Sequence, residues 1–220
     1  MSFPQLRRVI RALIKAVAVF ALAPMPALAG SQVEEHLAPS VVAGLQRAIA
    51  DNPAPAVYAN QPGLRPWRDE MSRRLAPKVS DPGSRGDFIA TVHYEAARAG
   101  LDPQLVLGVI QYESNFRKYA ISSADARGYM QVMPFWTKLI GSGEHNLFNL
   151  RTNLRYGCVI LRHYLDAENG DLYRALGRYN GSLGRPEYPN AVLGTMNRNW
   201  LYPPATVPKP VAALSPVAAR

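Results

Sequence analysis

The sequence predicts an all-α domain over residues 86–201. Apolar residues recur at helical spacing in several consecutive segments, and capping and stop residues flank those segments. No segment carries a strong strand signal, and no internal repeat is visible. The chain has 220 residues, which is enough for one domain of this size with an extension at each end.

The segment before this domain, residues 30–85, is predicted to be a short extension of helical and irregular structure. Residues 40–50 show an amphipathic pattern, and residues 67–75 could form a second short helix. The prolines of residues 52–66 predict an irregular connector between them, and residues 81–83 read as a turn. The sequence assigns no chemistry to this region.

Each helix of the domain is predicted from its cap, its apolar stripe and its stop signal. Asp87 can cap a helix that ends at Gly100, a common residue just beyond a helix end. Asp102 is a good N-cap for the next helix, and Pro103 fits the first helical position. The predicted helices cover residues 87–99, 103–116, 134–140, 150–168, 172–180 and 189–200.

One acidic residue interrupts the apolar stripe of the 103–116 helix. At helical steps Glu113 falls in the middle of an apolar arc, which consists of Leu105, Val106, Val109, Ile110, Tyr112 and Phe116. An ionised carboxylate on a buried stripe costs free energy unless it is paired or its pKa is raised. A raised pKa is what a general acid needs at neutral pH. A glutamate that turns to water or meets an arginine is an equal alternative on position alone.

The first residues have the features of an export signal. Basic residues precede a short apolar run at 16–23, and Ala27-Leu28-Ala29 fits a small-x-small cleavage site. We therefore predict a signal peptide over residues 1–29, with cleavage before Gly30. An uncleaved anchor is disfavoured because the run is far shorter than the ~20 residues that a spanning helix needs.

The net charge of the chain limits the classes of partner that it is expected to bind. Removing residues 1–29 takes away four of the 25 basic residues and none of the 16 acidic ones, which leaves 21 against 16, a net charge of +5. Mild basicity suits an anionic polymer or a membrane surface. The basic residues are scattered without aromatic interleaving, so no nucleic-acid partner is predicted.

Several residues indicate structural roles or exclude other chemistry. The lone Cys158 excludes an internal disulfide, and its helical spacing with leucines predicts a buried packing residue. Glu95 borders the stripe of its helix and is predicted to pair with a nearby arginine. The four histidines are far apart in sequence, so no metal and no cofactor are predicted. The tail over residues 202–220 is rich in Pro and Ala and shows no periodic apolar face.

Three short motifs stand in order along the domain. They are Glu113-Ser114-Asn115-Phe116, Gly128-Tyr129-Met130-Gln131-Val132-Met133-Pro134 and Tyr179-Asn180-Gly181. Their order and spacing resemble the lytic transglycosylase family with the lysozyme-like (soluble lytic transglycosylase, SLT) catalytic domain. The resemblance covers about half of the chain, residues 86–200. It implies a lysozyme-like helical catalytic domain with a glycan cleft.

The resemblance also implies a reaction. Members of this family cleave the β-1,4 bond between N-acetylmuramic acid and N-acetylglucosamine in peptidoglycan, and they leave a 1,6-anhydromuramic end. The glutamate of the Glu-Ser motif, which corresponds to Glu113, is the single acid/base. It would protonate the glycosidic oxygen and then accept the proton of the C6 hydroxyl as that oxygen closes on C1. The usual glycosidase needs two carboxylates for its reaction.

The remaining motif residues acquire roles from the same resemblance. Ser114 would hydrogen-bond near the acid and orient it. The residues expected to contact the glycan are Met130, Gln131, Tyr179 and Asn180. The Tyr179 hydroxyl or ring would hold the acid and the sugar. Core packing is the alternative for Met130 and Tyr179, and a backbone-bonded amide is the alternative for Gln131.

Two other functions stay open at this stage. A hydrolytic muramidase would need a nucleophile or base near Glu113, and Asp125 is the acidic residue in the loop between the first two motifs. A catalytically weak glycan-binding or assembly protein of the cell envelope is the second alternative, which the intact Glu113 disfavours. The expected location is the periplasm, and the expected partner is the peptidoglycan glycan strand. No stable membrane insertion after signal cleavage is expected, and an envelope-complex partner stays open.

Overall fold

A computed structural model of the chain describes residues 32–50 and 62–203. Over these ranges the regular structure consists of helices, and isolated bridges join Ile121 to Arg127 and Arg127 to Val132. The prediction of an all-α fold is therefore confirmed. The predicted signal peptide, most of the connector and most of the tail lie outside the described residues.

The predicted helices are present, with bounds that differ by a few residues. In chain order they are α2 (Pro39–Ala50), the 3-10 turn η1 (Pro62–Leu64), α4 (Arg65–Leu75), α5 (Pro82–Arg98), α6 (Pro103–Ser114), α7 (Phe135–Ile140), α8 (Leu150–Ala167), α9 (Leu172–Asn180), α10 (Glu187–Thr195) and the π-helical turn η2 (Met196–Trp200). The domain boundaries inferred from the sequence stay predictions.

The start of α5 corrects the prediction of a turn at residues 81–83. The helix is capped by Asp81, whose carboxylate accepts a hydrogen bond from the Ser84 backbone N–H at 2.7 Å. Pro82 occupies the first helical position, where its fixed φ suits a helix and its missing N–H costs nothing. The Asp-Pro pair that reads as a turn is thus the beginning of a helix, and Asp87 lies inside it.

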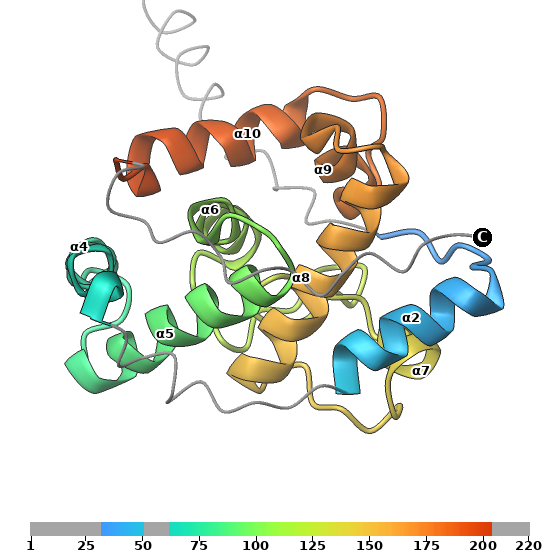
Figure 1. Cartoon of the computed structure of the whole chain (residues 1–220), viewed down its shortest axis with the longest axis horizontal. Helices are drawn as coiled ribbons and strands as arrows, with labels where there is room; N and C mark the ends of the chain where they lie inside the picture. Colours follow the sequence, from blue (N-terminus) through green and yellow to red (C-terminus); the bar gives the residue numbers. More distant parts are fainter. Residues whose placement is uncertain (1–31, 51–61, 204–220) are drawn as a thin grey trace, which may run out of the picture.

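Helix α6 runs through the middle of the molecule (Figure 1). α10 and η2 lie along one side of it, and α5 packs against it from another direction. Gly108 permits the close approach of η2, because a Cβ atom at this position would lie 3.0 Å from the Met196 Cβ. Nearly every residue from Pro103 to Ser114 is buried as a result, so the polar groups at the end of α6 are enclosed by protein.

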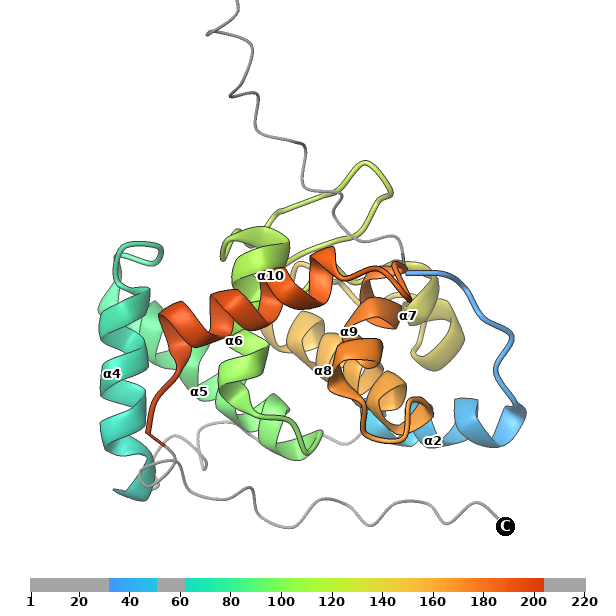
Figure 2. The same ribbon diagram turned by 90° about the horizontal axis from the view of Figure 1, so that it is seen from above.

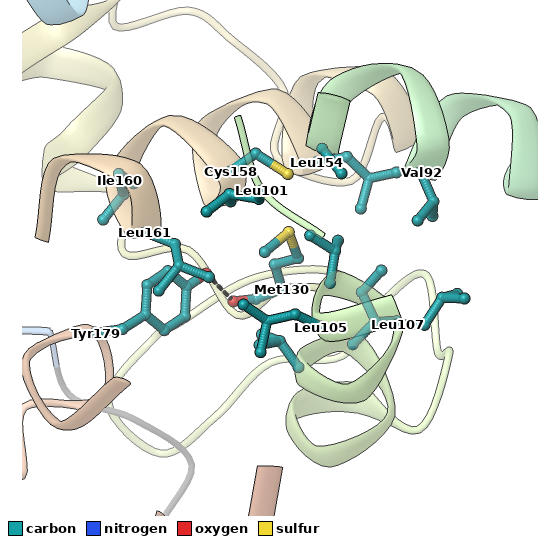
Figure 3. Close-up of a cluster of buried hydrophobic side chains, with 14 of the residues drawn as sticks. Val92, Leu101, Leu105, Leu107, Met130, Leu154, Cys158, Ile160, Leu161 and Tyr179 are labelled. Atoms are coloured by element: carbon teal, nitrogen blue, oxygen red, sulfur yellow. Dashed lines mark hydrogen bonds between the residues drawn. The ribbon is translucent and has the colours of Figure 1, made fainter. Parts of the chain in front are cut away.

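Side chains from α5, α6, α8 and α9 meet in one apolar core (Figure 3). Cys158 belongs to this core with 1% exposure, as its helical spacing predicts, and burial raises the pKa of its thiol. The helices of the predicted extension also contribute to the core, through Ile49, Trp67, Met71 and Leu75. α2 and α4 therefore pack against the domain. Within the described ranges, no helix has the length and apolar character to cross a membrane.

A buried ion-pair cluster connects three of the helices. Glu95 of α5 pairs with Arg155 of α8 at 3.0 Å and with Arg98 of its own helix at 3.2 Å. The two guanidinium groups also donate to backbone carbonyls near the end of α2, at Ile49 (3.1 Å) and Ala48 (2.5 Å). The prediction that Glu95 pairs with an arginine is confirmed, and the cluster ties α2 to the domain.

Replacing Glu95 with Gln should destabilise the protein by about 3–5 kcal/mol, because it leaves buried arginine charges without their carboxylate. Urea unfolding followed by circular dichroism measures this change. Glu70→Gln is the matched control, since Glu70 pairs with Arg73 and Arg74 on the exposed side of α4 and should matter much less. Equal effects of the two substitutions would contradict a structural role for the buried cluster.

Candidate active site

The candidate acid lies at the end of α6. The helix begins at Pro103 and ends at Ser114, and it is capped by Asp102, whose carboxylate accepts a hydrogen bond from the Gln104 N–H at 2.8 Å. The next two residues, Asn115 and Phe116, both adopt left-handed backbone conformations, with φ of 50° and 64°. Two such residues in succession end the helix and turn the chain away from its axis. Glu113 therefore lies in the last turn of a buried helix.

The environment of Glu113 holds a proton on its carboxyl group. The residue is 8% exposed, and its Oε1 accepts a hydrogen bond from the Tyr188 hydroxyl at 2.6 Å. Among the described residues, no hydrogen-bond partner faces Oε2. Burial raises the pKa of Glu113 to about 8, although the bond from Tyr188 acts in the opposite direction. A carboxyl that is protonated near neutral pH can serve as a general acid.

Tyr188 is a site residue that the sequence analysis missed. It lies in the first turn of α10, and its ring packs edge-on against Tyr112, with ring centroids 5.1 Å apart. The sequence predicts the last helix from residue 189 onward, which leaves Tyr188 outside it. A signal existed, because Tyr188, Val192 and Thr195 follow a helical i, i+4, i+7 spacing and all three are buried.

The second motif forms a turn that α8 holds in place. Asn153 of α8 accepts a hydrogen bond from the Met130 N–H at 2.8 Å and donates to the carbonyls of Arg127 (2.8 Å) and Leu147 (2.9 Å). Gly128 is required at the start of this turn, because its φ is +75° and a Cβ there would lie 2.4 Å from the Leu147 carbonyl oxygen. The side-chain amide of Asn153 therefore fixes the backbone of the second motif through three hydrogen bonds.

The third motif meets the second through a tyrosine. The Tyr179 hydroxyl, on α9, donates to the Met130 carbonyl at 2.8 Å, and the dashed line in Figure 3 marks this bond. Burial raises the pKa of the Tyr179 phenol, and Glu113 is close enough for a negative charge on its carboxyl to raise that pKa further. The three motifs therefore gather in one region, as the resemblance implies.

Most polar side-chain atoms of the other predicted site residues are hydrogen-bonded to the protein itself. The Ser114 hydroxyl donates to the Ile110 carbonyl at 3.1 Å, and the Gln131 amide donates to the carbonyls of Gly128 (2.9 Å) and Ala120 (3.2 Å). Met130 is fully buried in the core. Asn180 donates to the Ser182 hydroxyl at 3.0 Å, and its buried Oδ1 has no partner among the described residues. Contacts of these residues with a glycan stay predictions.

Asp125, the candidate base of a muramidase, is engaged elsewhere. Its side chain is 56% exposed and pairs with Arg127 at 2.9 Å. It adopts a left-handed conformation with φ of 67°, as expected in a surface turn. The hydrogen-bond partner found for Glu113 is a phenol and not a carboxylate.

A separate cavity of about 310 Å³ lies between the end of α2 and the start of α8. Its lining includes His145, Arg151 and Arg155, and it does not include Glu113. In the described ranges, no group of three or more His, Cys, Asp or Glu side chains could hold a metal ion.

A helical domain around one buried, protonated carboxyl defines a candidate general-acid enzyme, and comparisons identify its family. Residues 90–191 match the Transglycosylase SLT domain family. The chain is 33% identical over 135 residues to the Transglycosylase of Enterobacteria phage PRD1, and the aligned region covers 58% of this chain and 49% of the relative. It is 47% identical over 113 residues to the Membrane-bound lytic murein transglycosylase C of Haemophilus influenzae (strain PittEE), over 44% of this chain and 32% of the relative. No solved structure matches the chain.

Residues 90–191 therefore belong to the transglycosylase SLT domain family, as the three sequence motifs indicate. The chain spans half or less of the length of the curated relatives it matches.

Replacing Glu113 with Gln should remove a pH dependence of stability. The folded state keeps the Glu113 proton up to about pH 8, whereas the unfolded chain loses it near the ordinary value of 4.5. Between these values the unfolded state binds fewer protons, so wild-type stability should fall by about 1.4 kcal/mol per pH unit from this group. Urea unfolding at pH 5 and pH 8 measures the free energy of unfolding of both proteins. The value of the Gln variant should rise relative to that of the wild type as the pH rises. A difference that does not vary with pH would contradict the raised pKa.

Replacing Tyr188 with Phe should raise the pKa of Glu113 further, because the hydroxyl bond that favours the ionised form is lost. Carbon-detected NMR titration of the Glu113 carboxyl measures the shift directly. Tyr112→Phe is the matched control, since it alters the ring that packs against Tyr188 without removing a hydrogen bond to Glu113. A pKa that moves down in Tyr188→Phe would overturn this assignment.

Proposed function

We propose that the chain is a peptidoglycan lytic transglycosylase that cleaves the β-1,4 bond between N-acetylmuramic acid and N-acetylglucosamine. The observation that carries the proposal is the state of Glu113, which is buried and protonated near neutral pH. Among the described residues, its hydrogen-bond partner is Tyr188. Membership of residues 90–191 in the SLT family supports the substrate class. The names of the relatives, a transglycosylase and a lytic murein transglycosylase, support the reaction type.

In the first step Glu113 acts as a general acid. Its proton passes to the glycosidic oxygen as the bond between that oxygen and C1 breaks, and the positive charge develops on the sugar ring. The carboxylate that remains still accepts the hydrogen bond from Tyr188, which stabilises its negative charge. A pKa of about 8 suits this step, because the group is largely protonated before the reaction.

In the second step the same group acts as a base. The C6 hydroxyl of the muramic acid attacks C1, and its proton returns to Glu113 as the 1,6-anhydro ring closes. No water is consumed, and the enzyme ends the cycle protonated as it began. One carboxyl suffices for both steps, which agrees with the absence of a carboxylate among the described hydrogen-bond partners of Glu113. A hydrolytic route through Asp125 is disfavoured, because Arg127 holds that side chain at the surface.

The site of action that we propose is the peptidoglycan layer of the cell envelope, reached by export through the predicted signal peptide. Ser114, Met130, Gln131, Tyr179 and Asn180 are the proposed substrate-side residues. The Tyr179 hydroxyl supports this role indirectly, because it fixes the Met130 carbonyl and hence the shape of the second motif. Neither a metal nor a cofactor enters the proposed mechanism.

The mass of the released muropeptides tests this proposal. Purified protein incubated with peptidoglycan should release products that are one water lighter than hydrolysed ones. Glu113→Gln should lower the rate by at least about a thousandfold, since it removes the group that transfers both protons. Asp125→Asn is the matched control and should keep its activity, because Asn tolerates the left-handed turn.

Hydrated reducing ends would contradict the transglycosylase and indicate a muramidase. Binding of peptidoglycan without any release would favour a glycan-binding or assembly protein.

A further inference from the structure

The segment before α2 places one glutamine in the active-site region. Residues 32–38 have no regular structure, and most of their side chains are exposed, as at Val33 with 59% exposure. Gln32 is the exception, because only 4% of it is exposed. In Figure 2 this blue segment begins beside α7 and the loop between α9 and α10, and it then runs along the edge of the molecule to α2. Gln32 is thus the one fully buried side chain of the segment, while Leu37 packs against the core near α2.

The contacts of Gln32 are with residues of the second and third motifs. Its Oε1 accepts a hydrogen bond from the backbone N–H of Met133 at 3.3 Å. Its amide also lies beside the phenol of Tyr179, where it partly opposes the burial that raises the pKa of that phenol. Glu35 holds the same segment through an ion pair with Arg178, the residue before Tyr179, at 3.1 Å. Both anchors of the segment therefore lie next to the proposed substrate-side residues.

The fit of Gln32 in this place is incomplete. Its buried Nε2 has no hydrogen-bond partner among the described residues, and the same is true of the buried Asn180 Oδ1. Buried polar groups without partners cost free energy, so they call for an explanation other than stability. The Gln32 amide lies beside the Tyr179 phenol, and Asn180 follows Tyr179 in the chain, so a polar ligand bound next to Tyr179 would offer partners to groups of this kind.

The chemistry of the glutamine side chain matches part of the proposed substrate. A carboxamide presents a carbonyl oxygen and an N–H group on one planar unit, as does the acetamido group that both peptidoglycan sugars carry. The Met133 N–H is a fixed backbone donor that would be open to another carbonyl if Gln32 moved away. A glycan and the Gln32 side chain would then compete for the same donor.

We propose that the segment Gln32–Ala38 is an autoinhibitory strap, in which the Gln32 amide occupies the place of an acetamido group of the glycan. This inference rests on the proposed function. Within the described ranges the strap is held by the Gln32 hydrogen bond, by one partly exposed ion pair and by Leu37, which packs against the core close to α2. The two polar contacts at its far end are each weak, so closure over the site is reversible. The apparent affinity for the glycan is the affinity of the open form multiplied by the fraction of molecules in which the strap is open.

Binding of a tetramer of N-acetylglucosamine tests the strap without turnover. Isothermal titration calorimetry is carried out on the full chain with the Glu113→Gln substitution, alone and combined with Gln32→Ala. The Gln32→Ala variant should bind about fivefold more tightly, the factor to which one neutral hydrogen bond corresponds. Gln46→Ala is the matched control, because Gln46 is an exposed glutamine of α2 and should leave the affinity unchanged.

A second variant keeps the test decisive if Gln32→Ala folds poorly. Glu35→Gln releases the ion pair with Arg178 and leaves Gln32 intact, and Arg178 keeps its other partner, Glu168. This variant should also bind the tetramer more tightly. Unchanged or weaker binding in both variants would overturn the strap, and weaker binding would make Gln32 a residue that holds the glycan.

The outcome separates the strap from the proposed reaction. Tighter binding in the variants supports the strap even if no muropeptide is released from peptidoglycan, in which case only the proposed reaction fails. Anhydro products with unchanged binding support the reaction and overturn the strap. In the active protein, opening the strap should raise the rate at low peptidoglycan concentration by a factor similar to the gain in affinity.

Discussion

The burial of one carboxyl group at the end of α6 is the constraint on which the rest of the structure depends. Glu113 keeps its proton near neutral pH because helices enclose it, and α10 crosses α6 to supply Tyr188 as its hydrogen-bond partner. That one bond offsets part of the cost of ionisation, so the pKa is raised to about 8 and not beyond the range useful for proton transfer. The left-handed residues after Ser114 end the helix just beyond the acid.

Backbone geometry builds the opposite side of the site. Asn153 of α8 and Tyr179 of α9 fix the backbone of Met130, because Asn153 accepts a hydrogen bond from its N–H and Tyr179 donates one to its carbonyl. Gly128 is needed because no Cβ fits beside Asn153 and the Leu147 carbonyl. Polar side chains of the motifs are thus largely used to fix the chain itself, and the Met133 N–H is bonded to Gln32 of the N-terminal segment.

The N-terminal segment combines a firm anchor with a weak one. The end of α2 is bound to the domain through Arg98 and Arg155, which donate to its last carbonyls while they pair with the buried Glu95. The other end of the segment rests on Gln32 and Glu35, with one hydrogen bond and one ion pair. A segment fixed at α2 and weakly held at the site can open without loss of the fold, which is the property that a competitive strap requires.

The sequence by itself determined the all-α class, most helix bounds and the place of Glu113, because caps, prolines and apolar spacing act over a few neighbouring residues. It also indicated that Cys158 packs in the core and that Glu95 pairs with an arginine. The Asp81-Pro82 pair was interpreted as a turn, whereas it begins helix α5. Only the tertiary structure decided which distant residues contact one another in the site. Tyr188 reaches Glu113 across 75 residues of chain, and Gln32 reaches Met133 across 101. Such contacts depend on how helices pack, and no local pattern encodes them.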